Sequence, residues 1–245
     1  MKLLQVPCSQ RLFSSSFSGV RKFHVDKPKD FIGLIGICDD RNSSYLKGTK
    51  LAPPKIRELL QCDSSNSFSE LKIEIPSYIY DYGDYHPGQN FPDISKIIAN
   101  MCDEDRIPLT LGGDHSITVP VFTAVRKAVG EPITIIHFDA HPDLYPLFQD
   151  NVHSHASPFA RILEQENACR KLIQVGIRTV NDIQEAQISK YNVKAIEAKD
   201  FPAKGTDLLT EFRKHIPNND SPVYISVDID VLEPVSSHVF LHLSI

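Results

Sequence analysis

The sequence predicts an α/β protein built around a mostly parallel sheet. Short apolar runs alternate with amphipathic stretches through most of the chain, which is the pattern of strand–helix repeats. The run Ile133–Phe138 is apolar on both faces, as the central strands of parallel sheets are. The 245 residues show no internal repeat and no interior linker, so residues 26–245 are expected to form a single domain.

The first half of the chain is expected to supply three strands and three helices. The apolar run at 31–37 predicts a strand, and the Pro53-Pro54 pair marks the start of a helix that carries Ile56, Leu59 and Leu60 at helical spacing. A loop-rich stretch with a strand at 77–80 follows, then an amphipathic helix at 93–102. The next strand, 107–111, ends at a Gly-Gly pair, and a helix over 116–129 follows it.

The second half repeats this alternation after the central strand at 133–138. Helices are expected at 158–168, near 181–190 and near 205–215. Short apolar runs between them predict strands at 172–176, 193–196 and 223–229.

Composition excludes several classes of protein. With 26 basic and 31 acidic residues the net charge is −5, so no basic surplus indicates binding to nucleic acid or to an anionic membrane. The longest apolar runs are about ten residues, well short of the ~20 that a membrane-spanning helix needs. The 5 cysteines are scattered and form no CxxC pair, which favours reduced thiols over disulfides or a cysteine-built zinc site.

Residues 1–25 differ from the rest of the chain. They contain no Asp or Glu, they are rich in serine, and they carry the basic residues Lys2, Arg11, Arg21 and Lys22. Such a segment is typical of a mitochondrial or plastid transit peptide, and mitochondria are the expected destination. The alternatives are a plastid address, or a tail without any address in a cytoplasmic protein.

Metal-binding side chains gather after three of the predicted strands. Asp139, His141 and Asp143 come directly after strand 133–138, and a VDID motif ends strand 223–229 with Asp228 and Asp230 on one face. Asp114 and His115 follow the Gly-Gly pair, at the start of a helix. Ligands of open α/β sheets bind at the carboxyl ends of the strands, so these side chains are expected to converge.

The six candidate ligands are too many for one ion and suit two ions that share bridging carboxylates: His115, Asp139, His141, Asp143, Asp228 and Asp230. Their mixed oxygen and nitrogen donors favour Mn²⁺, with other divalent cations as alternatives. Two such ions would lower the pKa of a bridging water to roughly 7, which makes a bridging hydroxide the expected nucleophile.

The motifs LGGDHS, DAHPD and SVDID, in this order, resemble the three metal motifs of the ureohydrolases, the arginase and agmatinase family. NSSYLKGTKLAPPKIRE, HSHASPFARI and QVGIRT resemble further parts of that family, in the version shared by plant-type arginases and agmatinase-like members. The resemblance implies a three-layer αβα sandwich, a binuclear manganese centre and hydrolysis of a guanidino group to urea plus an amine. It also implies assembly into trimers or hexamers.

Carried over by motif, one manganese would be held by His115, Asp139, Asp143 and Asp228, and the other by Asp139, His141, Asp228 and Asp230. Asp139 and Asp228 would bridge the two ions. His155 matches the family's histidine that transfers a proton near the leaving amine, a role that suits an imidazole. His153, two residues earlier, is the alternative for that role.

The chain departs from the family after the VDID motif. The segment EPVSSHVFLHLSI lacks the family's Pro-Gly-Gly stretch and its Glu-x-Asn-Pro motif, whose Glu grips the substrate guanidinium. A C-terminal truncation, with the last strand or strands of the sheet missing, is therefore expected. Two alternatives to an active ureohydrolase follow: an impaired isoform that binds metal and associates with full-length subunits, and a different amidine hydrolase.

The substrate stays open between L-arginine, which would give ornithine, and agmatine, which would give putrescine. The loop 145–151 lacks the glycine-asparagine stretch by which animal-type arginases recognise the α-amino acid end, but plant-type arginases carry a loop similar to this one.

Overall fold

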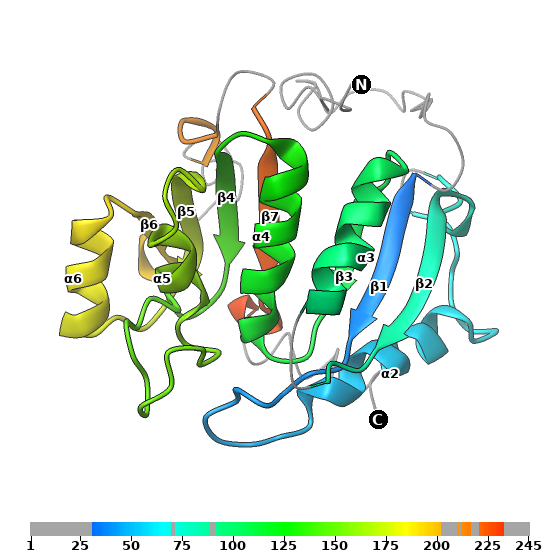
Figure 1. Cartoon of the computed structure of the whole chain (residues 1–245), viewed down its shortest axis with the longest axis horizontal. Coiled ribbons are helices and arrows are strands. Elements are labelled where there is room, and N and C mark those ends of the chain that lie inside the picture. Colours follow the sequence, from blue (N-terminus) through cyan, green and yellow to red (C-terminus); the bar gives the residue numbers. More distant parts are fainter. Residues whose placement is uncertain are drawn as a thin grey trace. The chain divides into compact units, whose positions relative to one another are not determined.

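A computed structural model describes residues 31–69, 72–88, 92–201, 210, 212–216 and 221–232. The expected transit peptide at residues 1–25 and the segment after Leu232 lie outside these residues, as does most of the helix expected near 205–215. The chain divides into two compact units between Ala128 and Val129, and each unit is described by itself (Figure 1).

The first unit contains a three-stranded parallel sheet with the strand order β2-β1-β3. The strands are β1 (Ile32–Ile37), β2 (Ile79–Tyr85) and β3 (Ile107–Leu111). Its helices are α2 (Ala52–Leu60), α3 (Pro92–Asp103) and α4 (Thr118–Val129), with short 3₁₀ turns η1 (Thr49–Leu51), η2 (Pro76–Tyr78) and η3 (His115–Ile117).

Helix α3 packs against the first sheet through one apolar face. Ile94, Ile98 and Met101 recur at helical spacing and are all fully buried. A Cβ at Gly33 of β1 would meet the Met101 sulfur at 3.0 Å, so the helix lies directly on this strand. The amphipathic helix expected at 93–102 is thereby confirmed and explained.

The second unit contains a four-stranded parallel sheet with the strand order β6-β5-β4-β7. The strands are β4 (Ile133–Phe138), β5 (Cys169–Ile177), β6 (Lys194–Glu197) and β7 (Val223–Val227). The remaining elements are α5 (Pro158–Leu163), α6 (Asp182–Lys190), η4 (Ala198–Asp200) and η5 (Ile229–Val231).

Side chains pack on both faces of this second sheet at its strand β4. Successive strand residues point to opposite faces, and Phe159 of α5 packs on His137, with 4.0 Å between the ring centroids. On the other face Ile136 belongs to a buried apolar cluster against which Phe212 and Ile216 pack. A parallel sheet between two layers is the α/β architecture that the sequence predicts.

Several predicted boundaries were wrong, among them that of β5, which was expected at 172–176 and runs over Cys169–Ile177. The strand expected at 77–80 is replaced by η2 up to Tyr78, because Pro76 favours a helical first turn, and β2 runs from Ile79 to Tyr85. Helix α5 ends at Leu163 rather than residue 168, and Asn167, in the turn that follows, has a left-handed φ of 52°.

Strand β7 ends at Val227 rather than Ile229. The Asp228 side chain accepts a hydrogen bond from the Asp230 backbone N–H at 3.1 Å, which turns the chain into η5. The strict alternation expected through Asp228 and Asp230 therefore does not apply.

Among the described residues, no helix combines the length and the apolar character needed to cross a membrane.

Candidate metal centre

The carboxyl ends of β4 and β7 bring two acidic motifs of the second unit together. Phe138 pairs with Val227, and the Asp228 backbone N–H donates to the Phe138 carbonyl at 2.8 Å. Asp139 and Asp228 therefore follow neighbouring strands at equivalent positions. The location agrees with the expectation that polar ligands gather at strand ends.

Asp139, His141 and Asp230 form a compact group whose ligand atoms all lie within 4.8 Å of one another. The His141 Nδ1 lies 3.0 Å from Asp230 Oδ2 and 3.5 Å from Asp139 Oδ1. Hydrogen bonds to Asp139 and then Asp230 raise the pKa of His141 to about 10, against the lowering effect of its partial burial. The carboxylates thus stabilise positive charge at this point, and their oxygens with an imidazole nitrogen fit a divalent cation.

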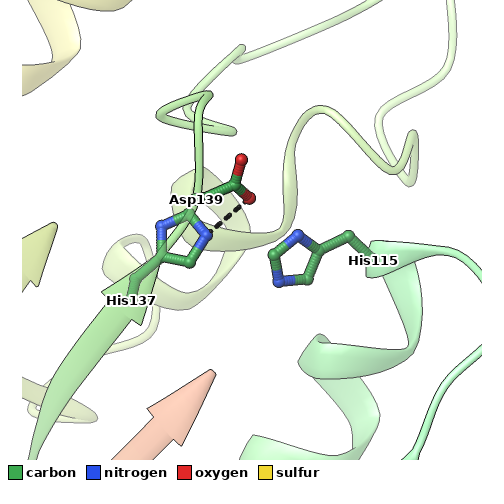
Figure 2. Close-up of side chains that lie close together, drawn as sticks. All are labelled: His115, His137 and Asp139. Atoms are coloured by element: carbon green, nitrogen blue, oxygen red, sulfur yellow. Dashed lines mark hydrogen bonds and ion pairs between the residues drawn. The ribbon is translucent and has the colours of Figure 1, made fainter. Parts of the chain in front are cut away.

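Asp139 is the buried member of the group, with 1% of its surface exposed. Its Oδ1 accepts the His141 backbone N–H at 2.7 Å, and its Oδ2 is bonded to His137 Nε2 at 2.8 Å (Figure 2). His137 is itself fully buried and bonded through Nδ1 to Gln174. His137 and Gln174 were not predicted as functional residues from the sequence. The one signal was a histidine inside a largely apolar strand.

Arg178 fixes the two ligand-bearing turns to each other. Its backbone N–H donates to the Ala140 carbonyl at 2.8 Å, in the turn between Asp139 and His141. Its guanidinium donates to the Val231 carbonyl at 3.0 Å and also to the Asp230 carbonyl, both in η5. Asp230 in turn accepts the Ala140 N–H at 3.1 Å through Oδ1.

The other residues of the second unit that the sequence singles out lie close in sequence to this group. Asp143 is 8% exposed and adopts a left-handed φ of 50°, and its carbonyl accepts the Phe159 N–H at 3.3 Å. Asp228 is half-buried. His155 is half-buried in the turn before α5, whereas His153 is exposed.

His115, the remaining predicted ligand, belongs to the first unit and stands half-buried at the start of η3 (Figure 2). Its neighbour Asp114 caps this turn by accepting the Ser116 N–H at 3.0 Å through Oδ1. Asp114 Oδ2 accepts the Asn42 backbone N–H at 3.0 Å and the Ser43 hydroxyl at 3.2 Å. The buried Asp114 therefore orders the turn and fixes the backbone from which His115 projects.

The Gly-Gly pair before Asp114 has a steric reason. A Cβ at Gly113 would overlap the Asp39 carbonyl, because the strand ends of β1 and β3 approach each other there. The Asp114 N–H donates to that same carbonyl at 2.8 Å. Glycine permits this close backbone approach.

Comparison with known proteins agrees with this geometry. The model of the arginase family matches residues 31–237. "Arginase 1, mitochondrial" from Oryza sativa subsp. indica is 40% identical over 215 residues, covering 82% of this chain and 62% of that protein. "Agmatinase, mitochondrial" from Gallus gallus is 31% identical over 217 residues, covering 82% and 61% respectively.

A solved structure gives the same result for the fold. The arginase from Medicago truncatula superposes with a TM-score of 0.72 at 35% sequence identity, covering 84% of this chain and 68% of that chain. The chain spans 62% of the length of the rice relative. Sequence motifs, parallel-sheet fold and strand-end carboxylates agree, and the chain belongs to the arginase family.

Proposed function

We propose that this chain is a binuclear manganese ureohydrolase that hydrolyses the guanidino group of L-arginine or agmatine to urea plus ornithine or putrescine. The observation that carries the proposal is the convergence of Asp139, His141 and Asp230 at the carboxyl ends of β4 and β7. Relatives that are named arginase and agmatinase support the guanidino substrate class. One solved relative, a Trypanosoma cruzi formiminoglutamase variant, is described with Mn²⁺, which supports the choice of metal.

All six predicted ligands are retained in this proposal: His115, Asp139, His141, Asp143, Asp228 and Asp230. Two manganese ions bound there would supply Lewis-acid activation of water at neutral pH. The role of the protein is to hold the metal-binding side chains in place. The buried Asp139 and the η5 turn fixed by Arg178 supply that rigidity.

Metal analysis of Asp228→Ala tests the proposal. The purified wild type, loaded with Mn²⁺, is expected to hold two ions per chain, whereas Asp228→Ala loses both because it lacks a bridging carboxylate. The control is Asp63→Ala, which changes an exposed aspartate of the first unit and should keep both ions. A wild type that holds one zinc and no manganese after manganese loading contradicts the proposal. Urea release from L-arginine and from agmatine, compared as kcat/KM, decides the substrate.

His155 is proposed to transfer a proton to the leaving amine. His155→Asn should keep the metals but lower turnover by roughly 10²-fold, the scale of acid–base assistance. His153→Asn is the matched control and should leave turnover unchanged. Loss of metal in His155→Asn would instead identify His155 as a ligand.

A mitochondrial location and a homo-oligomer complete the proposal. Plant relatives named mitochondrial, or chloroplastic and mitochondrial, support the location. A fluorescent reporter fused to residues 1–30 tests it, and a diffuse cytosolic signal would contradict it. Light scattering of the purified protein measures its molar mass in solution. A mass equal to that of one chain would contradict the homo-oligomer.

A further inference from the structure

His137 is a fully buried histidine in the centre of the second sheet, and the proposed metal ligands do not include it. We infer that His137 is a positioning residue: its Nε2–H, in a tautomer fixed by Gln174, holds the Asp139 carboxylate in the orientation that binds metal. The inference rests on the proposed function, because it assigns a role in that same centre.

The hydrogen bonds of Gln174 determine the tautomer of His137. The Gln174 amide nitrogen lies 2.6 Å from the Pro142 carbonyl oxygen and 3.0 Å from His137 Nδ1. A carbonyl oxygen only accepts, so the amide nitrogen, not the amide oxygen, must face Pro142. The two amide hydrogens then go to Pro142 and to Nδ1. Nδ1 is therefore the acceptor, and the ring proton of the neutral imidazole is on Nε2.

This orientation of the Gln174 amide leaves its oxygen without a hydrogen bond in the part of the chain that the structure describes. The Gln174 Oε1 is buried and has no hydrogen-bond partner among the described residues. The flipped amide would place two acceptor oxygens 2.6 Å apart, which is worse than one unsatisfied oxygen. The retained orientation is thus the one that presents a donor to His137.

The Nε2–H of His137 in turn fixes the rotation of the Asp139 carboxylate. It meets Oδ2 at 2.8 Å, while the His141 backbone N–H meets Oδ1 at 2.7 Å. These two hydrogen bonds, one to each oxygen, set the plane of the carboxylate and hold it in one orientation. A neutral N–H donor orients the carboxylate without adding a positive charge that would repel the cation.

The same geometry argues against His137 as a ligand. Its two ring nitrogens are committed to Gln174 and Asp139, and its ring packs on Phe159 with 4.0 Å between centroids. Binding an ion through Nε2 would break the bond to Asp139. Partners that orient metal ligands in this way typically change metal affinity by 10–100-fold when they are removed.

Two variants of the full chain separate the donor from the packing. His137→Phe keeps a ring against Phe159 but removes the donor, whereas His137→Gln keeps an N–H donor in a similar position. Mn²⁺ affinity, measured by titration calorimetry, should fall by roughly 10–100-fold in His137→Phe and largely recover in His137→Gln. Thermal unfolding of the metal-free variants reports whether the fold is kept. If His137→Phe does not fold, Gln174→Leu carries the test, with a smaller loss of affinity.

The tautomer has a direct readout that needs neither metal nor activity. Long-range ¹H–¹⁵N correlation of the metal-free wild type should show His137 with the proton on Nε2, and Gln174→Leu should weaken that preference. A proton on Nδ1, or His137→Phe with wild-type Mn²⁺ affinity, overturns the inference. A wild type that binds no manganese overturns the proposed function as well, so the two failures are distinguishable.

Discussion

Gly176, near the end of β5, is a position where a single added methyl group should disturb the candidate centre. Its φ of +98° lies in the region that residues with a Cβ avoid, at a cost of about 1–2 kcal/mol. A Cβ there would lie 2.5 Å from Val231 Cγ2 and 3.3 Å from the Asp139 carbonyl oxygen. Overpacking of this kind costs typically 1–3 kcal/mol. Gly176→Ala should therefore lower the free energy of unfolding by about 2–5 kcal/mol.

The clash also reaches the candidate ligands. Val231 follows Asp230 in η5, so a shift of η5 away from β5 would relieve the overlap. That movement would lengthen the 3.0 Å separation of His141 Nδ1 and Asp230 Oδ2. Gly176→Ala should consequently weaken Mn²⁺ binding in addition to destabilising the fold.

Urea unfolding and manganese titration of four proteins form the assay: wild type, Gly176→Ala, Val231→Ala and the double variant. Val231→Ala removes the clashing methyl, so the double variant should recover the steric part of the loss, about 1–3 kcal/mol, but not the backbone part. The reasoning is refuted if the free energy of unfolding of Gly176→Ala lies within about 0.5 kcal/mol of wild type, the usual range of neutral substitutions. It is also refuted if the double variant is no more stable than Gly176→Ala.

Two further predictions concern the second unit and the thiols. The Asn181 side chain caps α6 by accepting the Gln184 N–H at 3.0 Å, so Asn181→Ala should cost about 1 kcal/mol in urea unfolding, while Asn181→Asp keeps the acceptor and should cost little. Burial raises the pKa of Cys169 to about 12, so at pH 8 only about one thiol in 10⁴ is thiolate. Iodoacetamide should label the exposed Cys62 long before Cys169, as followed by peptide mass spectrometry. The labelling rate of Cys169 should rise about tenfold per pH unit up to about pH 11, because the thiolate fraction rises by that factor. Equal labelling of the two cysteines at about pH 8 would contradict this.

The sequence predicted those elements that a local pattern marks, either a short apolar run or apolar residues at helical spacing. Strands 107–111 and 133–138 were predicted with the bounds that the structure has. Helix α3 was predicted because its apolar residues repeat at helical spacing. The location of the acidic motifs at strand ends was also predictable, because polar residues that interrupt an apolar run mark where a parallel strand leaves the sheet.

Features set by contacts distant in sequence were not predictable in the same way. Strand β2 contains polar residues and a glycine that indicate a loop, and it becomes a strand because it pairs with β1. The role of His137 depends on Gln174, which lies on the neighbouring strand β5. No local pattern connects these two residues; the strand register places them opposite each other.

The candidate centre depends on a structural repeat that the sequence shows only as isolated motifs. In both D-A-H and D-I-D the first aspartate accepts the backbone N–H two residues later: Asp139 from His141 at 2.7 Å, and Asp228 from Asp230 at 3.1 Å. This local bond ends each strand and turns the third residue of the motif back over the strand end.

Parallel register then aligns the two turns. Phe138 is opposite Val227, so the first aspartates occupy equivalent positions on neighbouring strands, roughly 4.8 Å apart as strands are. The third residues, His141 and Asp230, consequently meet, with 3.0 Å between their side-chain atoms. A slip of one residue in the β4–β7 pairing would put the two first aspartates out of register and separate these groups. The register of β4 against β7 is therefore what converts two linear motifs into one array of cation-binding side chains.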